Sequence, residues 1–573
     1  MGPRLAALGL VLVGLTANIA AYPLLDPDEG RNAEVAREMA ATGEFALPHL
    51  NGLPYVDKPA LHFAVTALAV KTFGATEFAA RLPSLLFTLG TLGVVGWFGR
   101  RLLGSAGGWA AVIATGAAPL TLGFARTVIF DATLTFFVVV ALAAFYLATD
   151  RRDGGAGSLV ASPGPSVRRS AWGEGAGWGW TAVAWAAIGL GVLTKGPIAL
   201  ALPLMVAAPY AAWRRASAAV WTPVGPLLCA AIVLPWVLAV SRHIPDLVRY
   251  TLVTETAERL FTERLQRTEP IWYFLPILLA GALPGSALVV AGWRAAGPLR
   301  LPDGTRDPRT VFLLLWILIP LAFFSLSHSK RPQYMLPIVP AVALLAARGW
   351  RPTYLPGARE AGMLLMALGG VVGLAPVIVP RLLDVSEGTR AAMPQAAAFI
   401  GAATAMGGAL LWLSRRRGEL ALVALALPAA TIPLASRALM REIGRERSAA
   451  ALAEGIRAAV PPGGRVVAIQ TFPLSLPFYL NQPVLLATDS GRELTSNYLS
   501  RRMHRWRAAP GTPLRPANWW REALQECRAS VFVTRADDRP TRLILQTRLP
   551  LLIETSRHAA YGPCGRSPLA AGR

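Results

Sequence analysis

Long apolar runs alternate with short arginine-rich clusters along most of this chain. Each run is close to the roughly 20 residues that a helix needs to cross the hydrocarbon core of a bilayer. The pattern therefore predicts about thirteen membrane-spanning helices, with approximate limits 5–22, 81–99, 107–125, 130–149, 177–193, 197–213, 220–240, 271–292, 310–326, 332–347, 362–379, 396–413 and 420–435. A shorter apolar segment, residues 60–73, is expected to lie at the membrane interface or to re-enter the membrane.

The arginine clusters indicate an orientation, because Lys and Arg concentrate in cytoplasmic loops. If the N-terminus is cytoplasmic, six successive loops on that side carry arginine clusters. These clusters are Arg100–Arg101, Arg151–Arg152 with Arg168–Arg169, Arg214–Arg215, Arg294 with Arg300, Arg348 with Arg351, and Arg415–Arg417. The outer side then receives three long segments: 23–80, 241–270 and everything from 436 onward.

The fold class expected from this pattern is mainly α, a polytopic helical bundle with a small soluble domain. Residues 1–435 form the expected transmembrane domain, with the outer loop 23–80 carrying the candidate functional residues. Residues 436–573 shift to soluble-like polarity and contain strand-like stretches at 465–470 and 530–534. They are expected to form a small α/β domain on the outer face; a periplasmic location is what the family resemblance described below implies.

Composition excludes two other classes. The chain of 573 residues is 54% hydrophobic and only 16% charged, whereas a soluble protein carries about 25% charged residues. The formal net charge of +23 is explained by membrane topology, and no nucleic-acid-binding motif is present. The three cysteines have no zinc-site spacing, and Cys527 and Cys564 could pair only in an oxidising compartment.

Charged residues cluster where the first apolar run ends. Asp28, Glu29 and Arg31 follow that run, and Asp57 with Lys58 precedes another apolar segment. A carboxylate in this place can accept a proton from a hydroxyl or bind a divalent metal, while a cation can neutralise a lipid phosphate. The same spacing also fits a simple helix cap with surface ion pairs, so both interpretations stay open.

Four further residues are expected on the same outer side. Asp131 begins the fourth predicted span, and Lys195 interrupts two apolar runs. Lys330 and Arg331 precede a proline-rich apolar segment. The three cations suit a lipid phosphate held just above the hydrocarbon, although snorkelling of long side chains explains them equally well. For Asp131 the alternative is a helix cap.

Taken in order, seven segments resemble the bacterial lipid-linked-sugar glycosyltransferases of the GT-C class. The resemblance is to the aminoarabinose transferases of lipid A and their protein O-mannosyltransferase relatives. The matching segments are DPDEGRNAEVAREM, LNGLPYVDKPALHF, EFAARLPSLL, RTVIFDATLTFF, LTKGPIALALP, ERLFTERLQRTEPIWYFLPILLAG and FFSLSHSKRPQYMLPIVPAVALLAARG.

The resemblance implies roles for individual residues. Asp28 matches the principal catalytic carboxylate, Glu29 and Arg31 shape its site, and Asp131 matches a second acidic residue. Lys58 matches a lysine that contacts the lipid phosphate.

A divalent metal is implied at Asp57. Family members often carry a histidine before the Pro-aromatic run, where this chain has RTEP, so Glu269 is the only substitute ligand there.

The function implied is inverting transfer of a sugar from a polyprenyl (undecaprenyl-type) phosphate at the outer face of the bacterial inner membrane. The acceptor can be lipid A-like, another glycan or a protein, and the sequence identifies neither the acceptor nor the sugar. The expected partners are membrane lipids and these substrates. The alternative is a transporter or flippase for a lipid-linked glycan, which predicts internal repeats and charges near the bilayer midplane; neither is evident.

Overall fold

A computed structural model describes residues 2–152, 175–258, 269–292, 306–351, 355, 357–460, 463–526 and 529–563. The chain divides into two compact units that interleave along the sequence. The helical unit contains Met1–Ala17, Ser84–Val385 and Met393–Ser436, and the mixed unit contains Asn18–Pro83, Ser386–Ala392 and Arg437–Arg573. Cys527, Cys564 and the arginine clusters at 168–169 and 294–300 lie outside the described residues.

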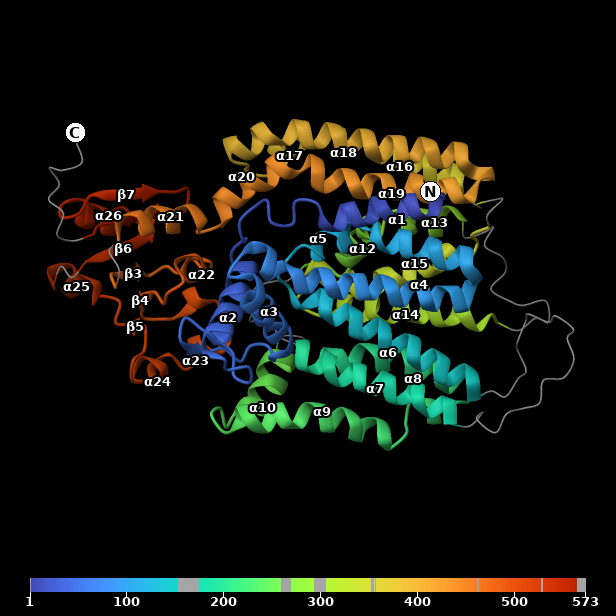
Figure 1. Ribbon diagram of the computed structural model, residues 1–573, viewed down its shortest axis with the longest axis horizontal. Helices are drawn as coiled ribbons and strands as arrows, with labels where there is room; N and C mark the ends of the chain where they lie inside the picture. Colours follow the sequence, from blue (N-terminus) through green and yellow to red (C-terminus); the bar gives the residue numbers. More distant parts are fainter. Residues whose placement is uncertain are drawn as a thin grey trace, which may run out of the picture. The chain divides into compact units, whose positions relative to one another are not determined.

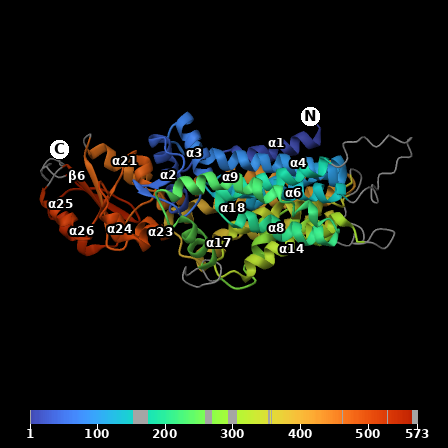
Figure 2. The same cartoon turned by 90° about the horizontal axis from the view of Figure 1, so that it is seen from below.

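The helical unit is built from α-helices that run along one common direction (Figures 1 and 2). Its elements are α1 (Pro3–Thr16), α4 (Glu77–Gly116), α5 (Pro119–Phe124), α6 (Phe130–Arg152), α7 (Gly175–Lys195), α8 (Ile198–Trp213), η1 (Ser217–Ala219), α9 (Val224–Ser241), α10 (Leu247–Arg249), η2 (Tyr250–Glu258), α12 (Phe274–Gly281), α13 (Gly285–Gly292), α14 (Pro308–Leu326), η4 (Pro332–Ile338), α15 (Val339–Ala347), α16 (Ala358–Gly373), α17 (Ala375–Leu382), α18 (Glu387–Leu413), η5 (Ser414–Arg416) and α19 (Gly418–Ala435). Helices α4 and α18 begin in the mixed unit and continue into this one.

The described residues include seven helices that are long and apolar enough to cross a membrane. They are Glu77–Gly116, Phe130–Asp150, Gly177–Lys195, Ser217–Ser241, Pro308–Leu326, Glu387–Arg416 and Gly418–Ala435. The pair α16 and α17, bent by 61°, adds an eighth if it forms one broken span. Other predicted spans coincide with shorter apolar helices, among them α1, α8 and η4 with α15. The chain is therefore a multi-pass membrane protein of mainly α structure.

Helix α4 covers two predicted spans because it folds back on itself at Gly104. That residue has φ 77°, a left-handed value that glycine adopts without strain. On either side of it the two arms are in contact. A Cβ placed on Gly99 would lie 3.1 Å from the Cα of Gly108, and one on Gly96 would lie 2.8 Å from Val112. The two arms thus form a tight antiparallel hairpin, which only small residues permit.

The mixed unit combines helices with a two-stranded and a six-stranded sheet. Its elements are α2 (Asp28–Thr42), β1 (His49–Leu50), β2 (Leu53–Pro54), α3 (Leu61–Phe73), α20 (Arg437–Arg447), α21 (Ala450–Ala459), β3 (Arg465–Ile469), α22 (Leu476–Leu480), β4 (Leu485–Ala487), η6 (Arg492–Leu494), α23 (Asn497–Arg501), α24 (Met503–Arg507), β5 (Leu514–Arg515), α25 (Trp520–Glu526), β6 (Ser530–Arg535), α26 (Arg539–Gln546), β7 (Leu551–Glu554) and β8 (His558–Tyr561).

The six-stranded sheet confirms the strands predicted at 465–470 and 530–534. Its order is β5-β4-β3-β6-β8-β7. The first four are parallel, with Arg465 opposite Ser530, whereas β8 and β7 add antiparallel strands at one edge. Val467, Phe532 and Tyr561 are fully buried in its core, as the continuous apolar runs of central parallel strands require.

The helical spacing of Asn32, Val35, Ala36 and Met39 predicts a short amphipathic helix lying on the membrane surface. The helix exists as α2, but its apolar face is not available to a membrane. Val35, Ala36 and Met39 on this face are buried within the mixed unit, where α2 contacts α3, β1 and α22. The prediction of a helix was correct. The prediction that its apolar face contacts the membrane was wrong, because other elements of the mixed unit bury this face.

Candidate active site

Asp28 opens helix α2 and forms an ion pair with Arg31. The Oδ1 to Nη2 distance is 2.6 Å, and the Asp28 side chain is 29% exposed. A carboxylate at a helix N-terminus is stabilised by the positive end of the helix dipole. Arg31 also donates to the hydroxyl of Thr495 at 2.8 Å. Asp28 and Arg31 thus form an ion pair, and a C-terminal residue orients it.

Arg31 is surrounded by groups that keep it charged. Its guanidinium lies over the ring of Tyr55 at 6.0 Å. Burial alone would lower the pKa of Arg31, but Tyr55, Asp28 and Asp57 outweigh that effect and raise its pKa above the ordinary value. Arg31 therefore places a positive charge directly beside the Asp28 carboxylate.

Glu29 is a structural anchor. Its carboxylate accepts two hydrogen bonds from Arg81, at 2.9 and 2.8 Å, and one from the backbone N–H of Leu25. Arg81 is fully buried and donates further to the carbonyls of Ile19, Tyr22 and Pro23. The pair therefore holds the segment before α2 against the start of α4. Sequence reasoning missed Arg81 as a partner, although an arginine inside the apolar stretch EFAARLPSLL was a usable signal.

Asp26 links α2 to the C-terminal region. Its Oδ2 accepts from the Ser475 hydroxyl at 2.9 Å, and its N–H donates to the carbonyl of Arg447 at 2.7 Å. Burial raises the pKa of Asp26 to about 7, although the Ser475 hydrogen bond acts in the opposite direction. Gly30 makes the approach possible, because a Cβ there would lie 2.7 Å from the backbone nitrogen of Ser475.

Asp57 caps a helix of the C-terminal region. Its two oxygens accept the backbone N–H groups of Asn497 and Tyr498 at 3.0 and 3.1 Å, at the start of α23. The Lys58 ammonium donates to the Asp57 carbonyl at 2.7 Å. All five predicted residues of the first outer loop belong to the mixed unit: Asp28, Glu29, Arg31, Asp57 and Lys58. Arg31 and Asp57 contact residues more than 400 positions away in the sequence.

In the helical unit, Asp131 and Lys195 form a buried ion pair. Asp131 stands in the first turn of α6 and Lys195 in the last turn of α7, so each charge favourably faces a helix end of opposite polarity. The Lys195 ammonium lies 5.1 Å from the centre of the Tyr334 ring, which stacks among Phe274 and Phe324. The predicted acid and the predicted phosphate-binding lysine are direct partners.

Lys330, Arg331 and Glu269 also belong to the helical unit. The Lys330 ammonium donates to the carbonyl of Ser327 at 2.6 Å, and Arg331 precedes η4. Burial lowers the pKa of Lys330, whereas the charge of Glu269 acts to raise it. These residues lie close to one another on the segments that flank η4 and α12.

The metal implied at Asp57 and Glu269 does not fit the described residues. Both Asp57 oxygens already accept backbone hydrogen bonds. Among the described residues, no group of three or more His, Cys, Asp and Glu side chains is arranged to hold an ion. We therefore assign no chemical step to a metal.

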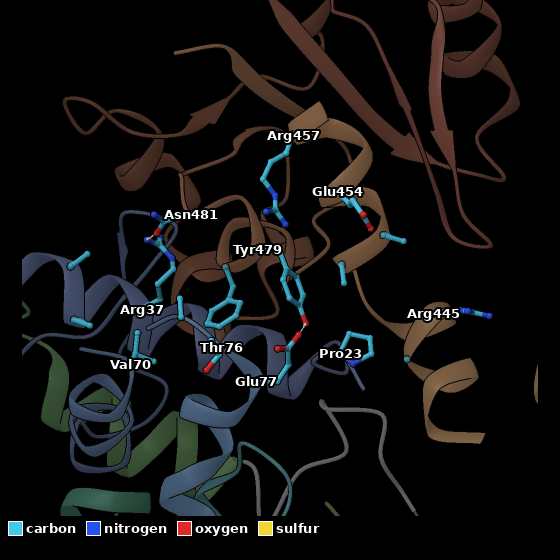
Figure 3. Close-up of a pocket in the computed structure, with 17 residues that line it drawn as sticks. Pro23, Arg37, Val70, Thr76, Glu77, Arg445, Glu454, Arg457, Tyr479 and Asn481 are labelled. Atoms are coloured by element: carbon cyan, nitrogen blue, oxygen red, sulfur yellow. Dashed lines mark hydrogen bonds between the residues drawn. The ribbon is translucent and has the colours of Figure 1, made fainter. Parts of the chain in front are cut away.

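The mixed unit also contains an open cleft of about 830 Å³ between α2, α3, α21 and α22 (Figure 3). Tyr479 points to Glu77 and donates to it at 2.9 Å, while Arg37 contacts Asn481. The side chain of Arg457 points toward Tyr479, with Glu454 beside it (Figure 3). Hydrogen-bond donors and acceptors thus share one cleft, which suits a polar ligand.

Comparison with known proteins finds relatives over part of the chain. Residues 24–251 match the family model described as dolichyl-phosphate-mannose-protein mannosyltransferase. A protein of Edwardsiella ictaluri, named undecaprenyl phosphate-alpha-4-amino-4-deoxy-L-arabinose arabinosyl transferase, is 33% identical over 368 residues, which cover 62% of each chain. The protein of the same name from Aeromonas hydrophila is 31% identical over 64% of this chain and 63% of its own. The chain thus spans slightly under two thirds of the length of these relatives.

Solved structures show the same fold over nearly the whole chain. The apo structure of ArnT from Cupriavidus metallidurans is 26% identical, has a TM-score of 0.74 and covers 97% of both chains. The structure of ArnT from the same organism bound to undecaprenyl phosphate is 24% identical, with a TM-score of 0.79 over 98% of this chain and 99% of that one. The second likeness concerns the fold alone.

Proposed function

We propose that the chain is an aminoarabinose-transferase-like membrane protein of the GT-C class and that it transfers a sugar from a polyprenyl phosphate. The donor is of the undecaprenyl type, as the names of its relatives suggest. The acceptor is lipid A-like, another glycan or a protein. We place the reaction at the outer face of the inner membrane.

The state of Asp28 carries the proposal. Three carboxylates stand at the start of α2, and two of them are committed to holding the structure: Glu29 to Arg81 and Asp26 to Ser475. Asp28 is partly exposed, with 29% of its side chain accessible, and its described partner is the nearby cation Arg31. An accessible, oriented carboxylate is what proton abstraction from an acceptor hydroxyl requires.

The reaction is a single displacement at the anomeric carbon. The acceptor oxygen forms the new bond as the bond to the phosphate oxygen breaks, and the configuration inverts. Asp28 takes the proton of an acceptor hydroxyl. The ion pair with Arg31 makes Asp28 a weaker base. A phosphate acceptor needs no strong base, and with such an acceptor Asp28 positions the nucleophile.

The leaving polyprenyl phosphate carries negative charge that positive side chains must stabilise. We assign this role to Lys58; Lys195, Lys330 and Arg331 are further candidates for it from the sequence pattern. Asp131, the second acidic residue that we propose for the reaction, fixes the position of the Lys195 ammonium through their ion pair. Glu29 then acts as a positioning residue, through its anchor to Arg81.

The proposed orientation has a cytoplasmic N-terminus and a periplasmic C-terminal domain. It rests on the six arginine-bearing inside loops. A cysteine at Thr127, in the turn before α6, should then react with an impermeant maleimide added to the outside of cells, in a chain whose own cysteines are replaced by serine. A cysteine at Ser105, in the α4 turn, should react only after lysis. The opposite pattern contradicts the orientation.

The test of the site compares Asp28→Asn with the wild type in lipid nanodiscs. Purified protein is given a panel of labelled polyprenyl-phosphate sugars together with membrane extract as acceptor. Loss of a general base lowers turnover by about 10²–10⁴-fold, with a normal thermal midpoint.

The matched control is Asp537→Asn, because Asp537 is an exposed acid paired to Arg535 on the surface. It should keep full turnover. Wild-type turnover in Asp28→Asn removes Asp28 from the mechanism.

A further inference from the structure

The helical unit contains a groove between α1 and α4 with a volume of about 820 Å³. We call it the α1–α4 groove. Leu8 and Leu12, one helical turn apart, contribute from α1, and Leu89 and Leu92 contribute from α4. The body of the groove is therefore apolar.

One end of the groove is strongly positive. Arg100 and Arg101 line it, and the guanidinium of Arg101 lies over the Trp97 ring at 4.8 Å. No acidic residue lines the groove, and among the described residues neither guanidinium has a carboxylate within ion-pairing distance. Elsewhere in the unit, Arg4 is paired with Glu419 and Arg348 with Asp307.

The α4 hairpin sets the depth of these groups in the membrane. Its turn at Gly104 must lie near the membrane surface, because turn backbone groups have no hydrogen-bond partners in hydrocarbon. Arg100 and Arg101 stand in the last turn before it, at head-group depth. Leu92 and Leu89 are 8 to 12 residues further along the helix, about 12–18 Å deeper.

Two tryptophans support this placement. Trp97 and Trp109 line the groove on either side of the turn. Tryptophan side chains favour the membrane–water interface, where one part is apolar and the other is wet. Positive charge, interfacial aromatic rings and a deep apolar channel thus follow one another along the groove, in the order of the parts of a phospholipid.

We propose that the α1–α4 groove binds an anionic phospholipid. Its phosphate accepts hydrogen bonds from Arg100 and Arg101, and one acyl chain lies along the leucines. The groove favours a head group with a net negative charge. A zwitterionic head group also carries a cation, and no carboxylate lines the groove to attract that cation. Binding there fixes α1 against the hairpin.

Gly93 offers a way to block the groove without touching the arginines. It lines the groove, is exposed, and a Cβ placed on it meets no atom within 4 Å. A leucine there projects into the space that the acyl chain needs. Gly370 in α16 is an equally open helical position outside the groove, so Gly370→Leu is its control.

The experiment titrates the delipidated, full-length protein with phosphatidylglycerol or phosphatidylcholine in detergent and counts bound lipid by native mass spectrometry. Wild-type protein should retain phosphatidylglycerol preferentially. The double variant Arg100→Gln/Arg101→Gln should bind it about thirtyfold more weakly. Gly93→Leu should lose the same tight site while keeping both charges.

Arg415→Gln/Arg416→Gln removes the same charge from exposed arginines of η5, outside the groove, and should bind as the wild type does. Equal retention of both lipids by the wild type overturns the proposal, as does tight binding by the double variant or by Gly93→Leu. If the η5 variant loses as much phosphatidylglycerol binding as the groove variant, binding depends on overall charge, and this result also overturns the proposal.

Discussion

Asp26, Asp28 and Glu29 lie within four residues of one another, yet they have different roles. Glu29 is locked by Arg81, Asp26 is half-buried and bonded to Ser475, and Asp28 keeps contact with solvent. Their spacing predicted an acidic cluster. It could not separate the three roles, because the partner Ser475 is 449 residues away in the sequence.

Asp26 makes the mixed unit sensitive to pH. Its folded-state pKa of about 7 lies above the ordinary 3.8, so the folded state binds the proton more tightly than the unfolded state does. The stabilising contribution is therefore fully present below about pH 4 and is lost as the pH rises through 7. Hydrogen exchange of residues 473–480, corrected for intrinsic rates, should be faster at pH 8 than at pH 6.

Asp26→Asn should remove this difference and give slower exchange at pH 8, because the amide carries no charge to bury. Asp537→Asn is the control, since Asp537 is fully exposed and should leave the difference unchanged. If Asp26→Asn keeps the wild-type pH dependence, another group is responsible.

At the scale of elements, the start of α2 is fixed to the start of α4 by one buried ion pair. Arg81 is fully buried, so removing its partner leaves an uncompensated charge in the interior. Glu29→Gln should therefore cost roughly 3–5 kcal/mol of stability. Thermal unfolding in detergent measures this as a lower midpoint.

The double variant Glu29→Gln/Arg81→Met measures how much of the stability loss comes from the interaction between the two side chains. It should lose less stability than the two single variants together, because the second change removes the stranded charge. Additive losses indicate that the two side chains act independently. Glu522→Gln, at an exposed position of α25, should show no change.

Elements with strong local signals were the predictable ones. The strands β3 and β6 follow from their apolar runs, and the long spans α6 and α14 follow from length and hydropathy. The apolar stretch at 271–292 gave no sign of its division into α12 and α13, and the covering of α2 by protein was also missed. These features depend on packing between distant segments, which local periodicity does not record.

At the scale of the whole molecule, the first predicted outer loop and the C-terminal region form one compact unit. The reason is that residues of the loop hydrogen-bond to C-terminal residues. Asp57 caps α23, and Arg31 donates to Thr495. Truncating the chain after the last span therefore disturbs the acidic cluster as well as the sheet. Sequence order alone suggests a boundary near residue 435 and conceals this dependence.

The central claim is that the protein breaks the bond between a sugar and a polyprenyl phosphate. The most direct test incubates wild-type protein in liposomes with a donor labelled in both the sugar and the lipid, together with an acceptor extract. We predict release of free polyprenyl phosphate in equal amount to sugar transferred, with inversion at the anomeric carbon. Movement of the intact labelled donor across the liposome membrane, with no cleavage for any sugar of the panel, would contradict the account and favour a flippase.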